Sequence, residues 1–224
     1  MIFKTKYKIV ILLLICFTYS RLMSQQEQNK NMFFFSIGNE DHYLVLGSYF
    51  SNTIHFKSLE TQSAMKLGIT YHRLITDQSI IVSGFNSISR YSDYFIDTNF
   101  ESKIYESFIE IPIGYSLFLG EFLSSRILFG LGININILNS QRFIVPEGTY
   151  ISDAFRKENN FGDYIKIGGF AQTGFFIPII KDRVSSTIVY CASNDHGIIL
   201  IDEDVISTPK YGSHGFIISI GFNF

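Results

Sequence analysis

Apolar and polar residues alternate with a period of two along most of the chain after residue 42. The pattern is clearest at the C-terminal end, where one face carries Phe216, Ile218, Ile220, Phe222 and Phe224. The opposite face carries Ser219, Gly221 and Asn223, with Ile217 as the exception. Such alternation is typical of a β-strand that has only one face in apolar surroundings. The segments 103–119 and 125–141 repeat the pattern, so the same arrangement is predicted for both.

Counting such segments predicts eight strands, over residues 42–56, 62–75, 79–94, 103–119, 125–141, 161–178, 183–196 and 213–224. Short connections at 76–78, 120–124 and 180–182 are interleaved with long connections at 95–102, 142–160 and 197–212. Short turns at one rim and long loops at the other are typical of outer-membrane barrels. We therefore predict an all-β fold, an eight-stranded antiparallel up-and-down transmembrane β-barrel, as a single domain over residues 42–224.

The first residues have the composition of an export signal. Lys4, Lys6 and Lys8 precede an apolar run over 9–17 that is too short to span a bilayer. We predict a cleaved signal peptide over 1–24 and a periplasmic lead-in over 25–41, with an extension of the first strand over 32–37 as the alternative. Loss of Cys16 with the signal leaves Cys191 as the only cysteine, so no internal disulfide is expected.

After the signal, no stretch approaches the ~18 to 20 continuous apolar residues that a membrane-spanning helix needs. Closed barrels are the other structures that satisfy every backbone polar group in hydrocarbon. The outward Ile, Leu and Phe side chains then require lipid against them, so we expect the cell outer membrane as location and its lipid as partner. A net charge of -2 gives no surplus for binding polyanions, and nucleic acid is not expected as a partner.

Short segments of the chain resemble a known family. These segments are YESFIEIPIGY over 105–115, RILFGLG over 126–132, GGF over 168–170 and the terminal GFNF over 221–224. They are similar to strand motifs of the PorT-like outer-membrane β-barrel proteins of Gram-negative bacteria. The resemblance implies an eight-stranded barrel whose C-terminal aromatics, Phe222 and Phe224, are recognised by the barrel-assembly machinery. It implies no substrate, because a fold does not determine a function.

Several polar side chains are predicted to point into the lumen. They are Lys66, Glu106, Glu110, Asn134 and Lys166. An eight-stranded barrel is too narrow for an open aqueous pore, so we expect a structural plug of ion pairs and hydrogen bonds, with a gated proton or ion path as the alternative. Pro112 lies in the middle of a strand and is expected to form a β-bulge there.

Histidines near predicted strand ends suggest a second kind of site. His55, His196 and His214, with Asp195 and Ser213 beside them, are expected at the extracellular rim. Such a group is compatible with lipid deacylation or metal binding, although polar residues are usual at any strand end. His72 is expected in the lumen and His42 at the periplasmic end. The acidic run Asp202, Glu203 and Asp204 is compatible with Ca²⁺, but a solvated loop is the simpler interpretation.

These features favour a non-enzymatic outer-membrane barrel with a structural or interaction role. We predict no cofactor and no metal, and we expect the loops, especially 142–160, to contact a protein partner. The alternatives are a lipid-modifying enzyme using the rim His and Ser residues, a transport or secretion accessory, and a secreted lipocalin-like binding barrel. A lipocalin carries apolar residues inside and polar residues outside, the reverse of the pattern predicted here.

Overall fold

The computed structural model describes residues 31–44, 54–55, 62–96, 100–144, 161–180, 183–200 and 211–224. Its strands are β1 (Asn31–Leu44), β2 (Ile54–His55), β3 (Gln62–Thr76), β4 (Ser79–Ile96), β5 (Phe100–Phe122), β6 (Ser125–Ile144), β7 (Tyr164–Ile180), β8 (Val184–Leu200) and β9 (Tyr211–Asn223). The predicted signal peptide, 1–24, lies outside the described residues. No helix in this part of the chain has the length and apolar character needed to cross a membrane.

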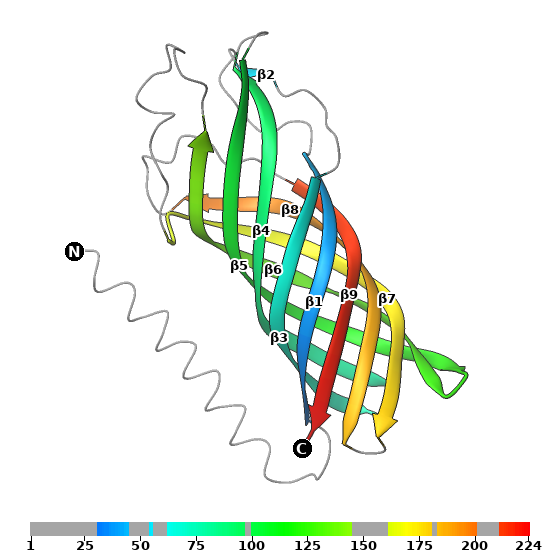
Figure 1. Cartoon of the computed structure of the whole chain (residues 1–224). Coiled ribbons are helices and arrows are strands. Elements are labelled where there is room, and N and C mark those ends of the chain that lie inside the picture. The colour runs from blue at the N-terminus through cyan, green and yellow to red at the C-terminus, as the bar shows by residue number, and fades with distance from the viewer. Residues whose placement is uncertain are drawn as a thin grey trace, which may run out of the picture.

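The strands close into a barrel (Figure 1). Apart from the two-residue β2, the eight long strands pair in the order β4, β3, β1, β9, β8, β7, β6 and β5, and β5 pairs again with β4. Every pairing is antiparallel. The predicted eight-stranded antiparallel barrel is therefore confirmed, and seven of its strands lie within a few residues of their predicted bounds.

The first strand is the exception. It was predicted over 42–56, but β1 runs from Asn31 to Leu44, so residues 31–41 are part of the barrel and not of a lead-in. The run Phe33 to Phe35 hides the period of two, because Phe34 is buried in the lumen while Phe35 is exposed outside. The correction also moves His42, which pairs with Gln62 and Ser213 at the loop end of the barrel and not at the turn end.

The two ends of the barrel domain meet at a seam between β1 and β9. Their register runs from Met32 opposite Asn223 to Leu44 opposite Tyr211. The Phe224 amide donates a hydrogen bond to the Asn31 carbonyl at 3.0 Å, and the rings of Phe33 and Phe224 stack with centroids 5.1 Å apart. Closure therefore depends on contacts between residues almost two hundred positions apart.

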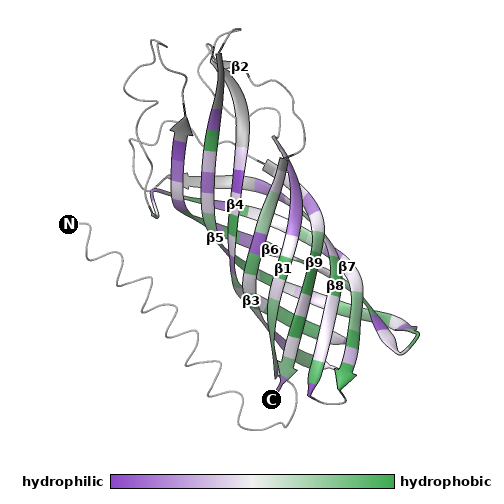
Figure 2. Ribbon diagram, in the orientation of Figure 1, coloured by the Kyte–Doolittle hydropathy of each residue, from purple (hydrophilic) through white to green (hydrophobic). Residues whose placement is uncertain are grey.

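The outer face of the barrel is apolar. Its exposed side chains include Phe35, Ile37, Leu67, Ile69, Ile113, Tyr115, Leu117, Phe129, Leu131, Ile133, Ile188, Phe216, Ile218, Ile220 and Phe222. The hydropathy of the ribbon alternates along these strands (Figure 2). The outward positions predicted for the C-terminal strand are confirmed, since Phe216, Ile218 and Ile220 are exposed while Ser219 is buried.

The lumen is polar only in part. Near the turn end it is filled by an apolar plug, which consists of Met32, Phe34, Ile80, Val82, Phe118, Leu128, Phe176 and Val189. The plug belongs to the interior face of the barrel, because Phe34 and Leu128 are almost completely buried. The buried charged side chains lie further toward the loop end; they include Glu40, Lys66, Glu106, Glu110, Lys166 and Asp195. The expectation of a polar lumen is therefore corrected for the turn end.

Pro112 does not form the expected bulge. It stands opposite Asn134 in the β5–β6 ladder, and the register shifts of that ladder lie elsewhere, at Ser107/Phe108 and Phe118/Gly120. Toward β4, the pairs Ser83–Ile113 and Asn86–Glu110 have the same register, with an interruption between them. Because proline has no N–H to donate, the ladder loses bonds at this point without bending into a bulge.

Candidate functional site

The lumen charges form two clusters. In the first, the Lys66 ammonium of β3 lies between two carboxylates, with its Nζ 3.0 Å from Oε1 of Glu40 on β1 and 2.6 Å from Oε1 of Glu110 on β5. Asn86 Nδ2 donates to Glu110 at 2.7 Å, and the Ser213 hydroxyl donates to Glu40 at 3.2 Å. This first cluster connects five strands across the interior.

The second cluster contains two cations and two carboxylates. Arg90 of β4 contacts Glu106 at 3.4 Å and Asp195 at 3.6 Å. Lys166 of β7 lies 3.6 Å and 3.9 Å from the same two carboxylates. Both cations also lie 4.7 Å from the centroid of the Phe108 ring. The lumen wall thus supplies opposite charge and an aromatic face to each cation.

The two clusters are close to charge balance. In this part of the lumen, the described side chains provide four carboxylates and three cations. Burying an ion costs several kcal/mol unless close partners compensate. Their direct contacts supply that compensation, so the arrangement is suited to bracing the strands against one another.

The structure brings four of the five lumen residues named from the sequence into these clusters. Lys66 and Glu110 lie in the first, and Glu106 and Lys166 in the second. Asn134 is buried as well, but its Oδ1 has no hydrogen-bond partner among the described residues. The network includes further residues that the sequence did not indicate for the lumen, namely Glu40, Asn86, Arg90 and Gln141.

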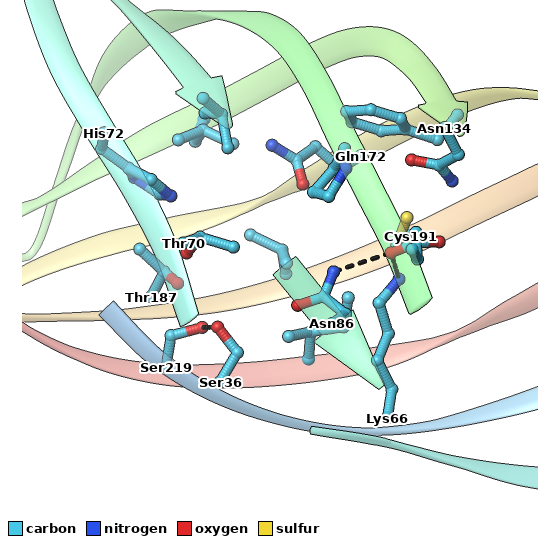
Figure 3. A pocket seen from close by; sticks show the side chains of 17 residues that line it. Ser36, Lys66, Thr70, His72, Asn86, Asn134, Gln172, Thr187, Cys191 and Ser219 are labelled. Atoms are coloured by element: carbon cyan, nitrogen blue, oxygen red, sulfur yellow. Dashed lines mark hydrogen bonds and ion pairs between the residues drawn. The ribbon is translucent and has the colours of Figure 1, made fainter. Parts of the chain in front are cut away.

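A small chamber of about 50 Å³ lies beside the first cluster (Figure 3). Asn86, Asn134 and His72 line it, and each has one buried polar atom without a hydrogen-bond partner among the described residues. A cavity needs ~10 to 15 Å³ of such space to hold a water molecule, so the chamber has room for ordered water. Cys191, a buried free cysteine, also lines this chamber.

The position of the chamber divides the lumen. Val82 and Leu128 of the apolar plug form part of its lining on the turn side, while Lys66 and Glu110 line it on the side of the charged clusters. His72 was expected in the lumen and is there, with its ring 4.4 Å from that of Phe34. From the loop end to the turn end, the interior thus contains the charged clusters, the chamber and the apolar plug.

The residues expected at the rim point to different sides of the wall. His214 contacts Tyr43 and Tyr190, which are exposed on the outside, with ring centroids 6.3 and 6.0 Å away. Ser213 instead faces the lumen, as does Asp195 of the second cluster. The three residues therefore do not form one group.

Other candidate residues lie outside what the structure describes. This holds for the side chains of His55 and His196 and for the acidic run 202–204. Most of the two long loops predicted over 142–160 and 197–212 is also outside, although β6 and β8 extend to Ile144 and Leu200. Within the described residues, no three His, Cys, Asp or Glu side chains are grouped to hold a metal ion.

Comparisons with known proteins find similarity in structure only. No family model matches the chain, and no curated protein matches it. Neisserial surface protein A is 13% identical over 86% of this chain and 97% of its own, with a TM-score of 0.47. The N-terminal β-barrel domain of Pseudomonas aeruginosa OprF is 10% identical over 88% of this chain and 100% of its own, with a TM-score of 0.44.

The outer membrane protein OprG from Pseudomonas aeruginosa is 10% identical over 88% of this chain and 97% of its own, with a TM-score of 0.45. Similarities of this extent carry no argument about function. The barrel fold described above therefore rests on the chain's own strand pairings.

Proposed function

We propose that this chain is a small integral outer-membrane β-barrel with a structural or interaction role. The observation that carries the proposal is the polarity of the wall, which has apolar side chains exposed outside and paired charges buried inside. In water, so broad an apolar surface is far larger than monomeric proteins tolerate. In a bilayer it meets acyl chains, and the closed ladder leaves no sheet edge unpaired in hydrocarbon.

The interior supports a barrel that is closed to solutes. The two charged clusters and the apolar plug occupy successive levels of the lumen. A gated proton or ion path remains the alternative role for the charged groups. The observed polarity argues against a lipocalin-like binding barrel, because the largest exposed apolar residues face away from the lumen.

The loop end is the proposed contact surface for a protein partner. Longer connections leave the barrel there, and the turn end would then face the periplasm. We propose no enzymatic activity and no cofactor. Of the rim residues named for the alternative, a lipid-modifying enzyme, Ser213 donates its hydroxyl into the lumen and His214 lies outside, so these two residues do not act together. Membership of the PorT-like family and an accessory role in transport or secretion stay predictions.

Arginine substitutions at two positions on the outer face of β6, one in the apolar band and one near the loop end, test the proposal. Leu131 lies in the apolar band, and Ser140 is exposed nearer the loop end of the same strand. Arginine near the bilayer midplane costs about 2 to 4 kcal/mol and much less near the interface. Leu131→Arg should therefore lower the free energy of unfolding in lipid vesicles by that amount, while Ser140→Arg should have little effect.

Fractionation of the wild-type protein completes the test. The membrane proposal expects the protein to stay with membranes in alkaline carbonate and to migrate differently on gels before and after boiling. Recovery in the soluble fraction, together with equal stability of Leu131→Arg and Ser140→Arg, would overturn it. Steady ionic current through refolded wild-type protein in planar bilayers would contradict the closed lumen but not the membrane location.

A further inference from the structure

The hairpin between β5 and β6 extends beyond its neighbours at the turn end. β5 pairs with β4 only up to Leu117 opposite Ser79, and β6 pairs with β7 only from Arg126 opposite Phe176. The β5–β6 ladder continues to Phe122 opposite Ser125. Residues 119–125, the hairpin tip, therefore form a two-stranded projection, which stands out to the side of the barrel wall in Figure 1.

The hairpin tip is apolar where a turn is usually polar. Leu119, Phe122 and Leu123 are exposed, and Leu123 is the most exposed large apolar residue described, at 83%. Leu123 and Ser124 have φ angles of 49° and 62°. Two-residue turns with positive φ at both positions strongly favour Asn-Gly. Leucine is thus unfavourable here both for its backbone conformation and for its exposure to water.

An external apolar contact accounts for the exposed apolar side chains, and the bilayer is the contact that the surroundings favour. Leu117 and Leu119 continue the apolar outer face of β5 down to the hairpin tip. Exposed Ile179 and Ile180 lie at the same end of the barrel, on β7. In Figure 1 the projection leans to one side of the barrel, so its tip lies away from the other turns at this end.

Polar groups at the base of the hairpin suit an interface between lipid and water. The Arg126 guanidinium lies 3.8 Å from the centroid of the Phe118 ring and donates a hydrogen bond to the Asp77 carbonyl. Glu121 is exposed near the tip. Arg126 thus holds the base of the hairpin against the lumen plug, and the exposed carboxylate of Glu121 is the charge that would lie at the headgroups.

We infer that the hairpin tip inserts Phe122 and Leu123 into the periplasmic leaflet of the outer membrane and so anchors this side of the barrel. The inference rests on the proposed membrane location. It adds a specific lipid contact outside the barrel wall, made by a turn that would otherwise lie in the periplasm.

Single-tryptophan fluorescence tests the inference, because the natural sequence contains no Trp. Leu123→Trp and Phe122→Trp report on the hairpin tip, and Leu131→Trp reports on the apolar band. Gln78→Trp is the matched control, since Gln78 is exposed in the neighbouring turn at the same end of the barrel. Each variant is reconstituted in vesicles of phosphatidylcholine with brominated acyl chains, after a gel shift on boiling shows that it is folded.

The inference expects blue-shifted emission from Leu123→Trp or Phe122→Trp, with bromine quenching comparable to that of Leu131→Trp, and weak quenching of Gln78→Trp. Red-shifted, unquenched emission from both tip variants, with Leu131→Trp still quenched, would overturn the inference and leave the proposed function standing. Equal quenching of Gln78→Trp would show that the contact is not specific to the hairpin tip and would also overturn it. Absence of quenching in Leu131→Trp would overturn the membrane location itself.

Discussion

At the scale of single residues, Lys66 shows how a buried cation is held in the lumen. It is nearly inaccessible to water and contacts carboxylates from two different strands, at 3.0 and 2.6 Å. Close ion pairs inside a protein compensate for desolvation only while both signs are present. The loss of stability should therefore be largest in a variant that removes the Lys66 ammonium and leaves both carboxylates buried.

Lys66→Met should lower the free energy of unfolding by about 3 to 5 kcal/mol, because Glu40 and Glu110 lose their shared cation. Urea unfolding of the reconstituted protein measures the change. Adding Glu40→Gln and Glu110→Gln to Lys66→Met removes the uncompensated charge and should recover much of the loss. Wild-type stability in Lys66→Met alone would show that the cluster does not brace the barrel.

At the scale of elements, the β5–β6 turn carries a local strain that a substitution can relieve. Ser124 has a φ of 62°, a conformation that costs non-glycine residues about 1 to 2 kcal/mol. Ser125 is the first residue of β6 and has no such φ. Ser124 and Ser125 thus have the same kind of side chain but different backbone conformations, so they can be compared directly.

Ser124→Gly should stabilise the barrel by about 1 kcal/mol, since glycine adopts positive φ without a Cβ clash. Ser125→Gly is the control and should destabilise by about 0.5 to 1 kcal/mol, because glycine in a strand loses more conformational entropy on folding. Both are measured by urea unfolding in the same vesicles. Opposite signs support the left-handed turn; a destabilised Ser124→Gly would contradict it.

At the scale of the whole molecule, the seam between β1 and β9 is where the barrel closes. Phe224 stacks on Phe33 at this seam, and Phe224 is also the terminal aromatic that the family resemblance connects with barrel assembly. Stacking contributes about 0.5 to 1.5 kcal/mol beyond burial. Two roles of Phe224, packing at the seam and recognition by the assembly machinery, can be tested separately. Phe33 takes part in the same ring pair but is not the terminal aromatic.

Phe224→Ala and Phe33→Ala both remove this ring pair, and Phe33→Ala also removes the contact with Tyr71. Both should refold in detergent, with a small loss of stability that is at least as large for Phe33→Ala. In cells, Phe224→Ala should lower the amount of assembled barrel several-fold relative to Phe33→Ala, because it alone removes the terminal aromatic. Heat-modifiable protein in membrane fractions measures assembly. Equal levels of the two variants would limit Phe224 to packing.

Much of the barrel follows from the sequence because alternation is a local property of a strand. Glu106 and Glu110 share a face of β5 with Ser116 and Phe118, so their inward direction is readable from parity alone. The same reasoning failed at Phe33 to Phe35, where three aromatic residues in a row mask the alternation, and it therefore missed Glu40. It also missed the apolar plug, because an inward Phe34 and an outward Phe35 have the same hydropathy.

The sequence by itself determined the eight-stranded barrel and the outward direction of its apolar residues, since both depend on period and spacing along one strand. Only the tertiary structure decided which charges meet. Lys66 lies 26 residues from Glu40 along the chain, and Lys166 contacts Asp195 only because β7 and β8 pair in one register. Register and closure are relations between strands, and no pattern within a single strand specifies them.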